Sequence, residues 1–204
     1  MSKTITLLLT IIITTSLFSD DLTFTEIQDA YSKSYNFEIL EKYDQAITHL
    51  KSIVEKYPDT YTVNYRLGWL YYLNGKYNNS LTHLKKASLV YPSSTEVINT
   101  TTLVHVARME WDKVISNATE AINIDYYNFY ANYWYSVALK VQKKYNLAIK
   151  IDRKMLTVLP VSTLFLAELG ENLVLSGSTE EGQQILESVL IIEPLNSIAL
   201  KYLK

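Results

Sequence analysis

The sequence contains no cysteine, only three histidines, five glycines and four prolines in 204 residues. The absence of cysteine excludes disulfide bonds, thiolate metal sites and a lipid-modified N-terminal cysteine. Lysine and arginine number 19 and aspartate and glutamate 21, so the formal net charge is −2. A chain this close to neutrality lacks the basic patch that marks nucleic-acid binding, and no nucleic-acid partner is expected.

The few prolines are regularly spaced. Pro58, Pro92, Pro160 and Pro194 stand 34, 68 and 34 residues apart, and the missing position of the series falls at Tyr126. A fixed 34-residue period is typical of a helical repeat array. It divides the sequence without insertions into five units, residues 27–60, 61–94, 95–128, 129–162 and 163–196.

Each unit predicts two helices that pack closely together. Apolar residues recur at intervals of three and four over two stretches of about 14 residues per unit. Gly75 and Gly177 share the fifteenth place, where a residue free to adopt positive φ can end the first helix. Small residues share the twentieth place and allow the second helix to approach the first, namely Ala46, Ser80, Ala148 and Gly182.

The second unit carries the clearest pattern, with Leu67-Gly68, Tyr71, Gly75, Tyr77, Ser80, Leu84, Ala87 and Pro92. In this pattern the chain resembles the tetratricopeptide repeat (TPR) family over residues 27–196. The resemblance implies an all-α fold, a right-handed superhelix (α-solenoid) of five helix-turn-helix repeats. It also implies a non-enzymatic scaffold or adaptor with protein or peptide partners.

Two units depart from the family pattern. The third has Thr101-Thr102 in place of Leu-Gly within a run of poor helix formers, residues 99–102, so we expect it to be the weakest unit. In the fourth, Asp152 occupies a place that is apolar elsewhere. Its carboxylate is expected either to bend out to solvent or to find a partner such as Lys144 or Arg153.

The sequence shows no convergent set of catalytic or metal-binding groups. Six residues separate Gly68 from Gly75, where a phosphate-binding loop needs four. His49 and His83 share the twenty-third place and are expected to lie about 10 Å apart, exposed on the outer face. His105 replaces a core aromatic residue and is expected to be a hydrogen-bonded interior histidine. We therefore predict no enzyme activity, no metal and no cofactor.

The resemblance implies that the first helix of each unit lines a concave groove. The second, fifth, sixth, ninth, twelfth and thirteenth places then give an aromatic-lined surface of Tyr31, Tyr35, Tyr65, Arg66, Trp69, Tyr72, Tyr130, Tyr133 and Trp134. Such rings are typical of binding hot spots and suit an extended peptide, or a glycan or cell-wall sugar that stacks on the same rings. The alternative is that individual rings pack between neighbouring first helices.

The two ends of the sequence carry further predictions. Residues 1–19 read as a secretory signal peptide, with Lys3 before an apolar run, and residues 20–26 as a lead-in. Cleavage after Ser16 or Ser19 leaves an exported, periplasmic or secreted protein without a membrane span, whereas retention makes the segment an anchor. Residues 197–204 predict a partial C-terminal capping helix, which either stays incompletely covered or docks against another chain, as in a homo-oligomer.

Overall fold

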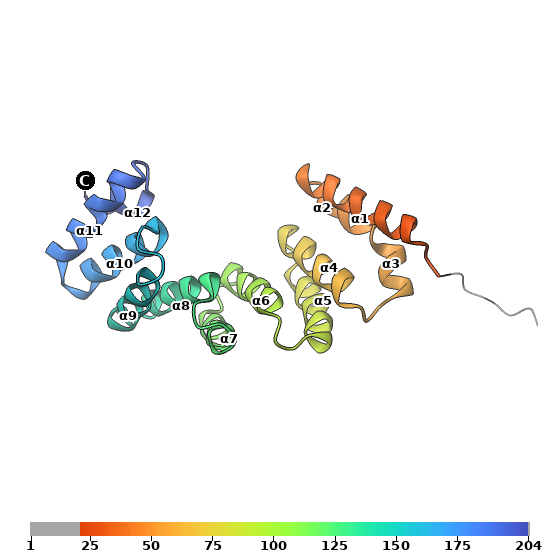
Figure 1. Cartoon of the computed structure of the whole chain (residues 1–204), viewed down its shortest axis with the longest axis horizontal. Coiled ribbons are helices and arrows are strands. Elements are labelled where there is room, and N and C mark those ends of the chain that lie inside the picture. The colour runs from red at the N-terminus through yellow and green to blue at the C-terminus, as the bar shows by residue number, and fades with distance from the viewer. Residues whose placement is uncertain (1–20, 204) are drawn as a thin grey trace, which may run out of the picture.

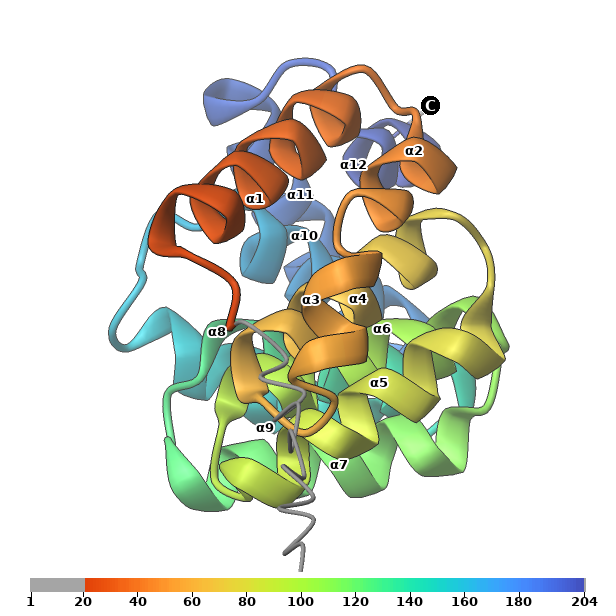
Figure 2. The same cartoon turned by 90° about the vertical axis from the view of Figure 1, so that its right-hand side faces the viewer.

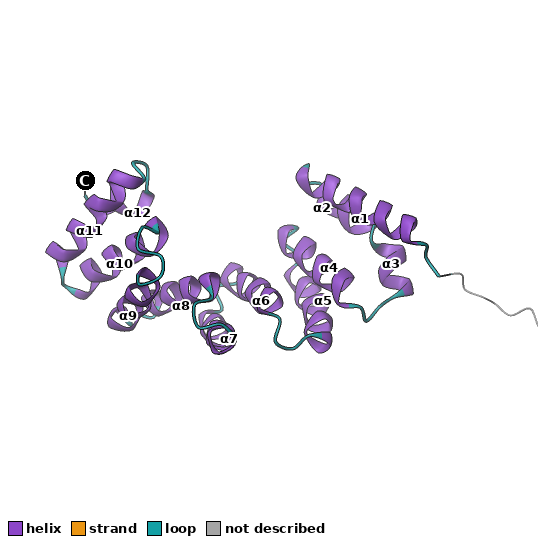
Figure 3. Ribbon diagram, viewed as in Figure 1, coloured by secondary structure: helices purple, strands orange, loops and turns teal. Residues whose placement is uncertain are grey.

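The computed structural model describes residues 21–203, so the predicted signal peptide lies outside the described part of the chain. Over residues 21–203 the chain forms twelve α-helices and no strand (Figures 1 and 3). The all-α prediction is confirmed. In the same residues no helix combines the length and the apolar character needed to cross a membrane.

The helices alternate between a first and a second helix in each predicted unit. The first helices are α1 (Phe24–Ile39), α4 (Tyr61–Leu73), α6 (Thr95–Ala107), α8 (Phe129–Val141) and α10 (Thr163–Ser176). The second helices are the pair α2 (Tyr43–Thr48) and α3 (Lys51–Lys56), then α5 (Tyr77–Val90), α7 (Trp111–Ile124), α9 (Tyr145–Leu156) and α11 (Thr179–Ile192). The last helix is α12 (Ser197–Tyr202).

The helix pairs follow one another along an arc. Contacts join α4 to α6, α6 to α8 and α8 to α10, so successive first helices lie side by side. In Figure 1 these helices lie on the inner side of the arc, which opens toward the top, and α5, α7 and α9 lie outside them. Figure 2 looks along the arc from α1, with α10 to α12 behind it. The first helices therefore form the concave surface.

Most first helices begin at the first residue of the predicted units, and α1 is the exception. It begins at Phe24, three residues before the predicted start at Ile27. Thr23 and Glu26 form a capping box in which the Thr23 amide donates to Glu26 Oε2 over 2.7 Å. Because this box satisfies backbone donors at the helix start, it moves the start of the helix into the predicted lead-in.

The turn between the two helices of a unit has the same backbone conformation throughout. Gly75 and Gly177 have positive φ angles of 69° and 99°, as predicted. Glu41, Met109 and Lys143 occupy the same place and have φ angles of 56°, 56° and 59°. The left-handed conformation is thus required by the repeat, and three side-chain-bearing residues adopt it at some cost.

The two helices of a unit pack closely at the twentieth place. Ala46, Ser80 and Ala148 are fully buried there. At Gly182 an added Cβ atom would lie 2.7 Å from the carbonyl oxygen of Gly170, so α10 and α11 touch backbone to backbone. The prediction that small residues allow close helix approach is confirmed at these positions.

The helix α6 forms in spite of its threonine run. The hydroxyls of Thr100, Thr101 and Thr102 each donate to the carbonyl four residues earlier, over 2.9, 2.8 and 2.8 Å. These local bonds satisfy the hydroxyl groups inside the helix, where they would otherwise compete with its backbone.

Asp152 finds a partner, as one of the two alternatives expected, but the partner is neither of the residues named as examples. The side chain is fully buried, and within residues 21–203 neither Lys144 nor Arg153 forms an ion pair or a hydrogen bond with it. Asn172 donates to Asp152 Oδ2 over 2.9 Å, while Arg153 pairs with Glu181 over 2.7 Å. Burial raises the pKa of Asp152 to about 7, against the lowering effect of the polar groups of Ser136 and Asn172. Asn172 and Glu181 belong to the next unit, so a reading within one unit does not reveal them.

The prediction of two exposed histidines is wrong. His49 stacks on Phe37 and His83 on Tyr71, with ring centroids 5.1 and 5.3 Å apart, and both histidines are half-buried. His105, by contrast, is buried as predicted, and its Nδ1 lies 2.6 Å from Glu110 Oε2.

The helix α12 covers part of the C-terminal end of the array. Ala199 is fully buried against Ala167, Leu186 and Val189. Ile191 and Leu195 nearby remain 83% and 85% exposed. Docking of this end to another chain stays a prediction.

Candidate functional site

Two adjoining hollows occupy the concave surface. The N-terminal hollow, of about 670 Å³, is lined by Tyr31, Tyr35, Glu38, Ile39, Tyr61, Thr62, Tyr65, Arg66, Trp69 and Glu96. The central hollow, of about 430 Å³, is lined by Tyr65, Trp69, Glu96, Asn99, Thr100, Leu103, Tyr130, Tyr133, Trp134 and Leu164. Tyr65, Trp69 and Glu96 border both hollows. The two hollows together form one groove that crosses α1, α4, α6, α8 and α10.

Eight of the nine sequence-predicted groove residues line these hollows, and Tyr72 does not. The Tyr72 ring packs 5.6 Å from Trp69 and 6.3 Å from Tyr77, against the core cluster that contains Leu84. For Tyr72 the packing alternative is therefore correct.

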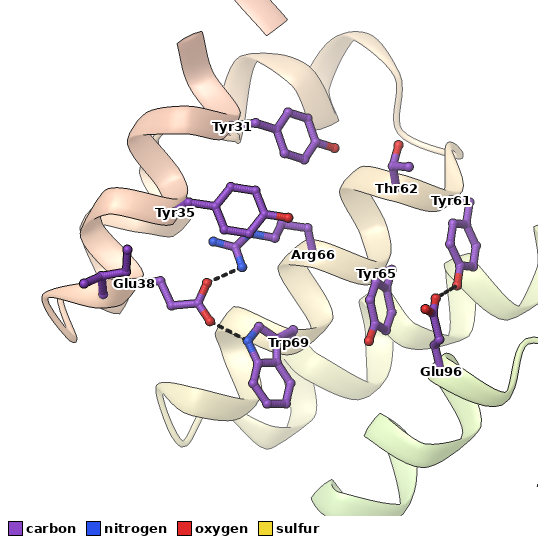
Figure 4. A pocket seen from close by; sticks show the side chains of 10 residues that line it. Tyr31, Tyr35, Glu38, Tyr61, Thr62, Tyr65, Arg66, Trp69 and Glu96 are labelled. Atoms are coloured by element: carbon purple, nitrogen blue, oxygen red, sulfur yellow. Dashed lines mark hydrogen bonds and ion pairs between the residues drawn. The ribbon is translucent and has the colours of Figure 1, made fainter. Parts of the chain in front are cut away.

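Arg66 lines the N-terminal hollow, but its side chain is held by contacts within the protein. It is 6% exposed and forms an ion pair with Glu38 of α1. Its guanidinium carbon lies 3.8 Å from the centre of the Tyr35 ring. Trp69 Nε1–H donates to the other oxygen of Glu38 over 2.6 Å (Figure 4). Arg66 therefore borders the groove, but its charge is paired within the protein, and these contacts fasten α1 to α4.

The remaining rings differ in how far they face the groove. Tyr130 and Tyr35 are 61% and 51% exposed. Tyr31 and Tyr133 are half-buried, and burial raises the pKa of both phenols. Tyr65 is also half-buried and packs against the second core cluster. Several rings thus serve the fold and the groove surface together.

The sequence-predicted set omits two acidic residues that line the groove. Glu38 and Glu96 occupy the twelfth and second places of their units. Both places are among the six groove positions used to select the rings, so the same criterion would have found both acids. Glu96 is exposed at the junction of the two hollows. The Tyr61 hydroxyl donates to Glu96 Oε2 over 3.0 Å and fixes the carboxylate there.

A second charged cluster joins α8 to α10 at the C-terminal end of the array. Lys140 Nζ lies 2.7 Å from Glu168 and 2.5 Å from Glu171. Glu171 also accepts hydrogen bonds from Lys201 over 3.1 Å and Tyr202 over 2.9 Å. Burial raises the pKa of Glu168, against the lowering effect of Lys140. Because these groups satisfy one another, the cluster fastens α12 to the array.

The chemistry available in the groove is that of recognition. Its polar groups are phenols, indoles, an amide, hydroxyls, carboxylates and the paired guanidinium of Arg66, and the described residues 21–203 contain no group of three or more side chains suited to hold a metal ion. Rings with a polar tip provide both contact area and hydrogen bonds to a bound chain.

Comparison with known proteins agrees with this architecture. The tetratricopeptide repeat family model matches residues 24–60 and 63–94. No curated protein sequence matches the chain. The family model thus matches the first two units of the array, and the same succession of first and second helices continues from α6 to α11.

Several solved structures share the fold. The protein MamA is 18% identical with a TM-score of 0.72, over 89% of this chain and 98% of MamA. A tetratricopeptide repeat protein from Parabacteroides merdae is 17% identical with a TM-score of 0.78, over 87% of this chain and 71% of that one. A thermophilic protein of the same kind from Thermus thermophilus is 14% identical with a TM-score of 0.63, over 86% and 96%. At these identities the likeness is one of fold.

Proposed function

We propose that this protein is a non-enzymatic adaptor of the cell envelope, which holds a partner protein by an extended peptide segment in the aromatic groove. Tetratricopeptide repeat proteins generally mediate protein–protein interactions and are typically non-catalytic. The observation that carries the proposal is the continuity of the groove, because Tyr65, Trp69 and Glu96 border both hollows. A continuous groove accommodates a chain better than a compact ligand.

An extended peptide fits the chemistry of this surface. Its side chains alternate between two faces, so every second one can lie on the rings. Exposed Tyr35 and Tyr130 and half-buried Trp134 supply contact area of the kind found at interface hot spots. A glycan or cell-wall sugar stacking on Trp69 or Trp134 is the alternative ligand, and a titration can distinguish the two.

The envelope location rests on the predicted signal peptide. We expect the mature chain to begin at Asp20, or at Leu17 if cleavage follows Ser16, and to occur in a soluble envelope fraction. N-terminal sequencing of the protein from its host tests this. Recovery of Met1 or Ser2 from the membrane pellet would instead identify the segment as an anchor.

Site-specific crosslinking tests the groove. A photo-crosslinking residue at Tyr65 should join the chain to one short segment of a partner, and the same residue at Leu89, which is 75% exposed on α5, should not. A synthetic peptide of the captured segment is then titrated against Tyr130→Ala, Trp134→Ala and Trp69→Ala. We expect one or two of these changes to cost about 2 kcal/mol or more of binding free energy.

The titration separates the two ligand classes. For a peptide, the loss should be spread over several rings, and soluble sugar should not compete. For a glycan, the loss should concentrate on Trp69 or Trp134, and sugar should compete. Thermal melts are needed for Trp69→Ala, because its indole holds Glu38. Unchanged affinity in all three folded variants would exclude the groove as the binding site.

A further inference from the structure

We propose that the bound segment carries a lysine or arginine whose cationic group sits at Glu96, against the rings of Tyr65 and Trp69. This inference rests on the proposed peptide-binding function. It names the charge that the partner must present at the point where the two hollows meet.

The first support is the balance of charge in the groove. The charged residues that line the two hollows are Glu38, Arg66 and Glu96. Glu38 and Arg66 form an ion pair, and Arg66 is buried. Glu96 has no ion-pair partner within residues 21–203. The groove therefore carries a net charge of −1, located at the junction, and a cationic ligand complements it.

The second support is the position of the Glu96 carboxylate. It is exposed and held by the Tyr61 hydroxyl over 3.0 Å. The Tyr61 and Tyr65 rings stack with centroids 5.9 Å apart, and Figure 4 shows Tyr65 between Trp69 and Glu96. A cation placed here can pair with the carboxylate and contact aromatic faces at the same time.

The third support is that the chain already binds a cation in this way a short distance along the groove. The Arg66 guanidinium pairs with the Glu38 carboxylate and lies 3.8 Å from the centre of the Tyr35 ring. The junction repeats the combination of a carboxylate and aromatic rings, but there the described chain supplies no cation. The N-terminal hollow is thus an internal example of the contact that we propose for the ligand.

Selection from a library of random peptides displayed against the full chain tests the inference. We expect the enriched peptides to share a basic residue flanked by apolar or aromatic ones and to lose binding to Tyr130→Ala. In a synthetic peptide, norleucine in place of that residue keeps the aliphatic stem and removes the charge. This replacement should weaken binding to the wild-type chain about tenfold, and more at low than at high salt.

The Glu96→Gln variant completes the test. It should bind the lysine or arginine peptide and its norleucine analogue equally, with an unchanged melting temperature because Glu96 is exposed. Glu187→Gln, which removes an exposed acid from α11, is the matched control and should behave as wild type. Equal binding of both peptides to the wild-type chain overturns the cation site, and Tyr130-dependent binding then still supports the groove. Failure to select any Tyr130-dependent peptide overturns both proposals.

Discussion

The two ends of the concave surface join neighbouring first helices through the same places of the repeat, but with the charges reversed. At the N-terminal end the twelfth place is Glu38, which binds Arg66 and Trp69 at the sixth and ninth places of the next unit. At the C-terminal end the twelfth place is Lys140, and its partners at the sixth and ninth places are acidic.

The ends also differ in burial and in the number of partners. The Glu38 side chain is 21% exposed, whereas those of Glu168 and Glu171 are 2% and 9% exposed. Two buried acids share Lys140, and of the two only Glu171 has further hydrogen-bond partners within residues 21–203. In the middle of the array the twelfth places are Tyr72 and Val106, which are uncharged. First helices can therefore pack together without charged residues at this place. Where a charged side chain is buried there, it needs an oppositely charged partner and hydrogen bonds.

The largest expected effect comes from removing the Lys140 ammonium group that Glu168 and Glu171 share at the C-terminal end. Lys140→Met leaves Glu168 buried without a partner, and we expect a loss of about 3 to 5 kcal/mol in the free energy of unfolding. Arg66→Met should cost about 1 to 2 kcal/mol, since Glu38 keeps the Trp69 N–H bond and partial contact with water. Urea unfolding of both variants measures the difference. Equal losses would mean that burial does not distinguish the two ends.

A change at the twentieth place compares the second helices. Ala148→Leu should overpack α8 against α9 and cost roughly 1 to 3 kcal/mol. Ala46→Leu should cost less, because the second helix of the first unit is already divided into α2 and α3 and can shift. Thermal melts of the two variants test this. An undiminished melting temperature for Ala148→Leu would contradict the assigned packing.

The twenty-fourth place compares a buried acid with a buried apolar residue. Asp152 and Leu50 are both fully buried, and the Asp152 pKa is raised to about 7. Because the folded state favours the neutral acid, stability should fall as pH rises from about 4, the unfolded pKa, to about 7, and stay level above.

Asp152→Asn should abolish that fall, since asparagine stays neutral. Lys140 and Glu168 also act on the Asp152 pKa, so they are kept unchanged in both proteins. We expect the variant to gain roughly 1 to 3 kcal/mol relative to wild type on going from about pH 5 to about pH 8. Urea titrations at the two pH values measure the gain. Parallel pH profiles would show that Asp152 is already ionised in the fold.

The smallest expected effects lie at the turns. Gly177→Ala should destabilise the last unit by about 1 kcal/mol, because its φ of 99° disfavours a side chain. Glu41→Gly in the first unit should change stability by no more than about 0.5 kcal/mol, since relief of the left-handed strain offsets the greater freedom of the unfolded chain. Differential scanning calorimetry resolves the pair. A loss at Glu41→Gly as large as that at Gly177→Ala would contradict the shared strain.

The sequence predicts the helices well because one pattern recurs at a fixed period. Second helices begin at Tyr77, Trp111 and Tyr145, each at the seventeenth place. The early start of α1 could also have been predicted, since Thr23 and Glu26 have the spacing of a capping box. What the period does not show is the contact between one repeat and the next.

The contacts that the sequence analysis missed, in the groove and elsewhere, mostly join one repeat to the next. A residue's position within the repeat tells which side of the helix it faces, so the six groove positions identify eight residues of the two hollows. It does not say that Arg66 meets Glu38, or that Asp152 meets Asn172, because each partner belongs to another unit. The stacking of His83 on Tyr71 lies within one unit, so a comparison of the eleventh and twenty-third places could have predicted it.

The side-by-side order of the first helices sets a length for whatever lies across them. Packed helices are about 8 to 10 Å apart, so the path from α4 through α6 to α8 measures roughly 16 to 20 Å. An extended chain advances about 3.3 Å per residue, and a segment of roughly five or six residues would reach from Tyr65 to Tyr130. The array thus acts as a ruler, and shorter segments would reach the rings at one end or the other but not at both.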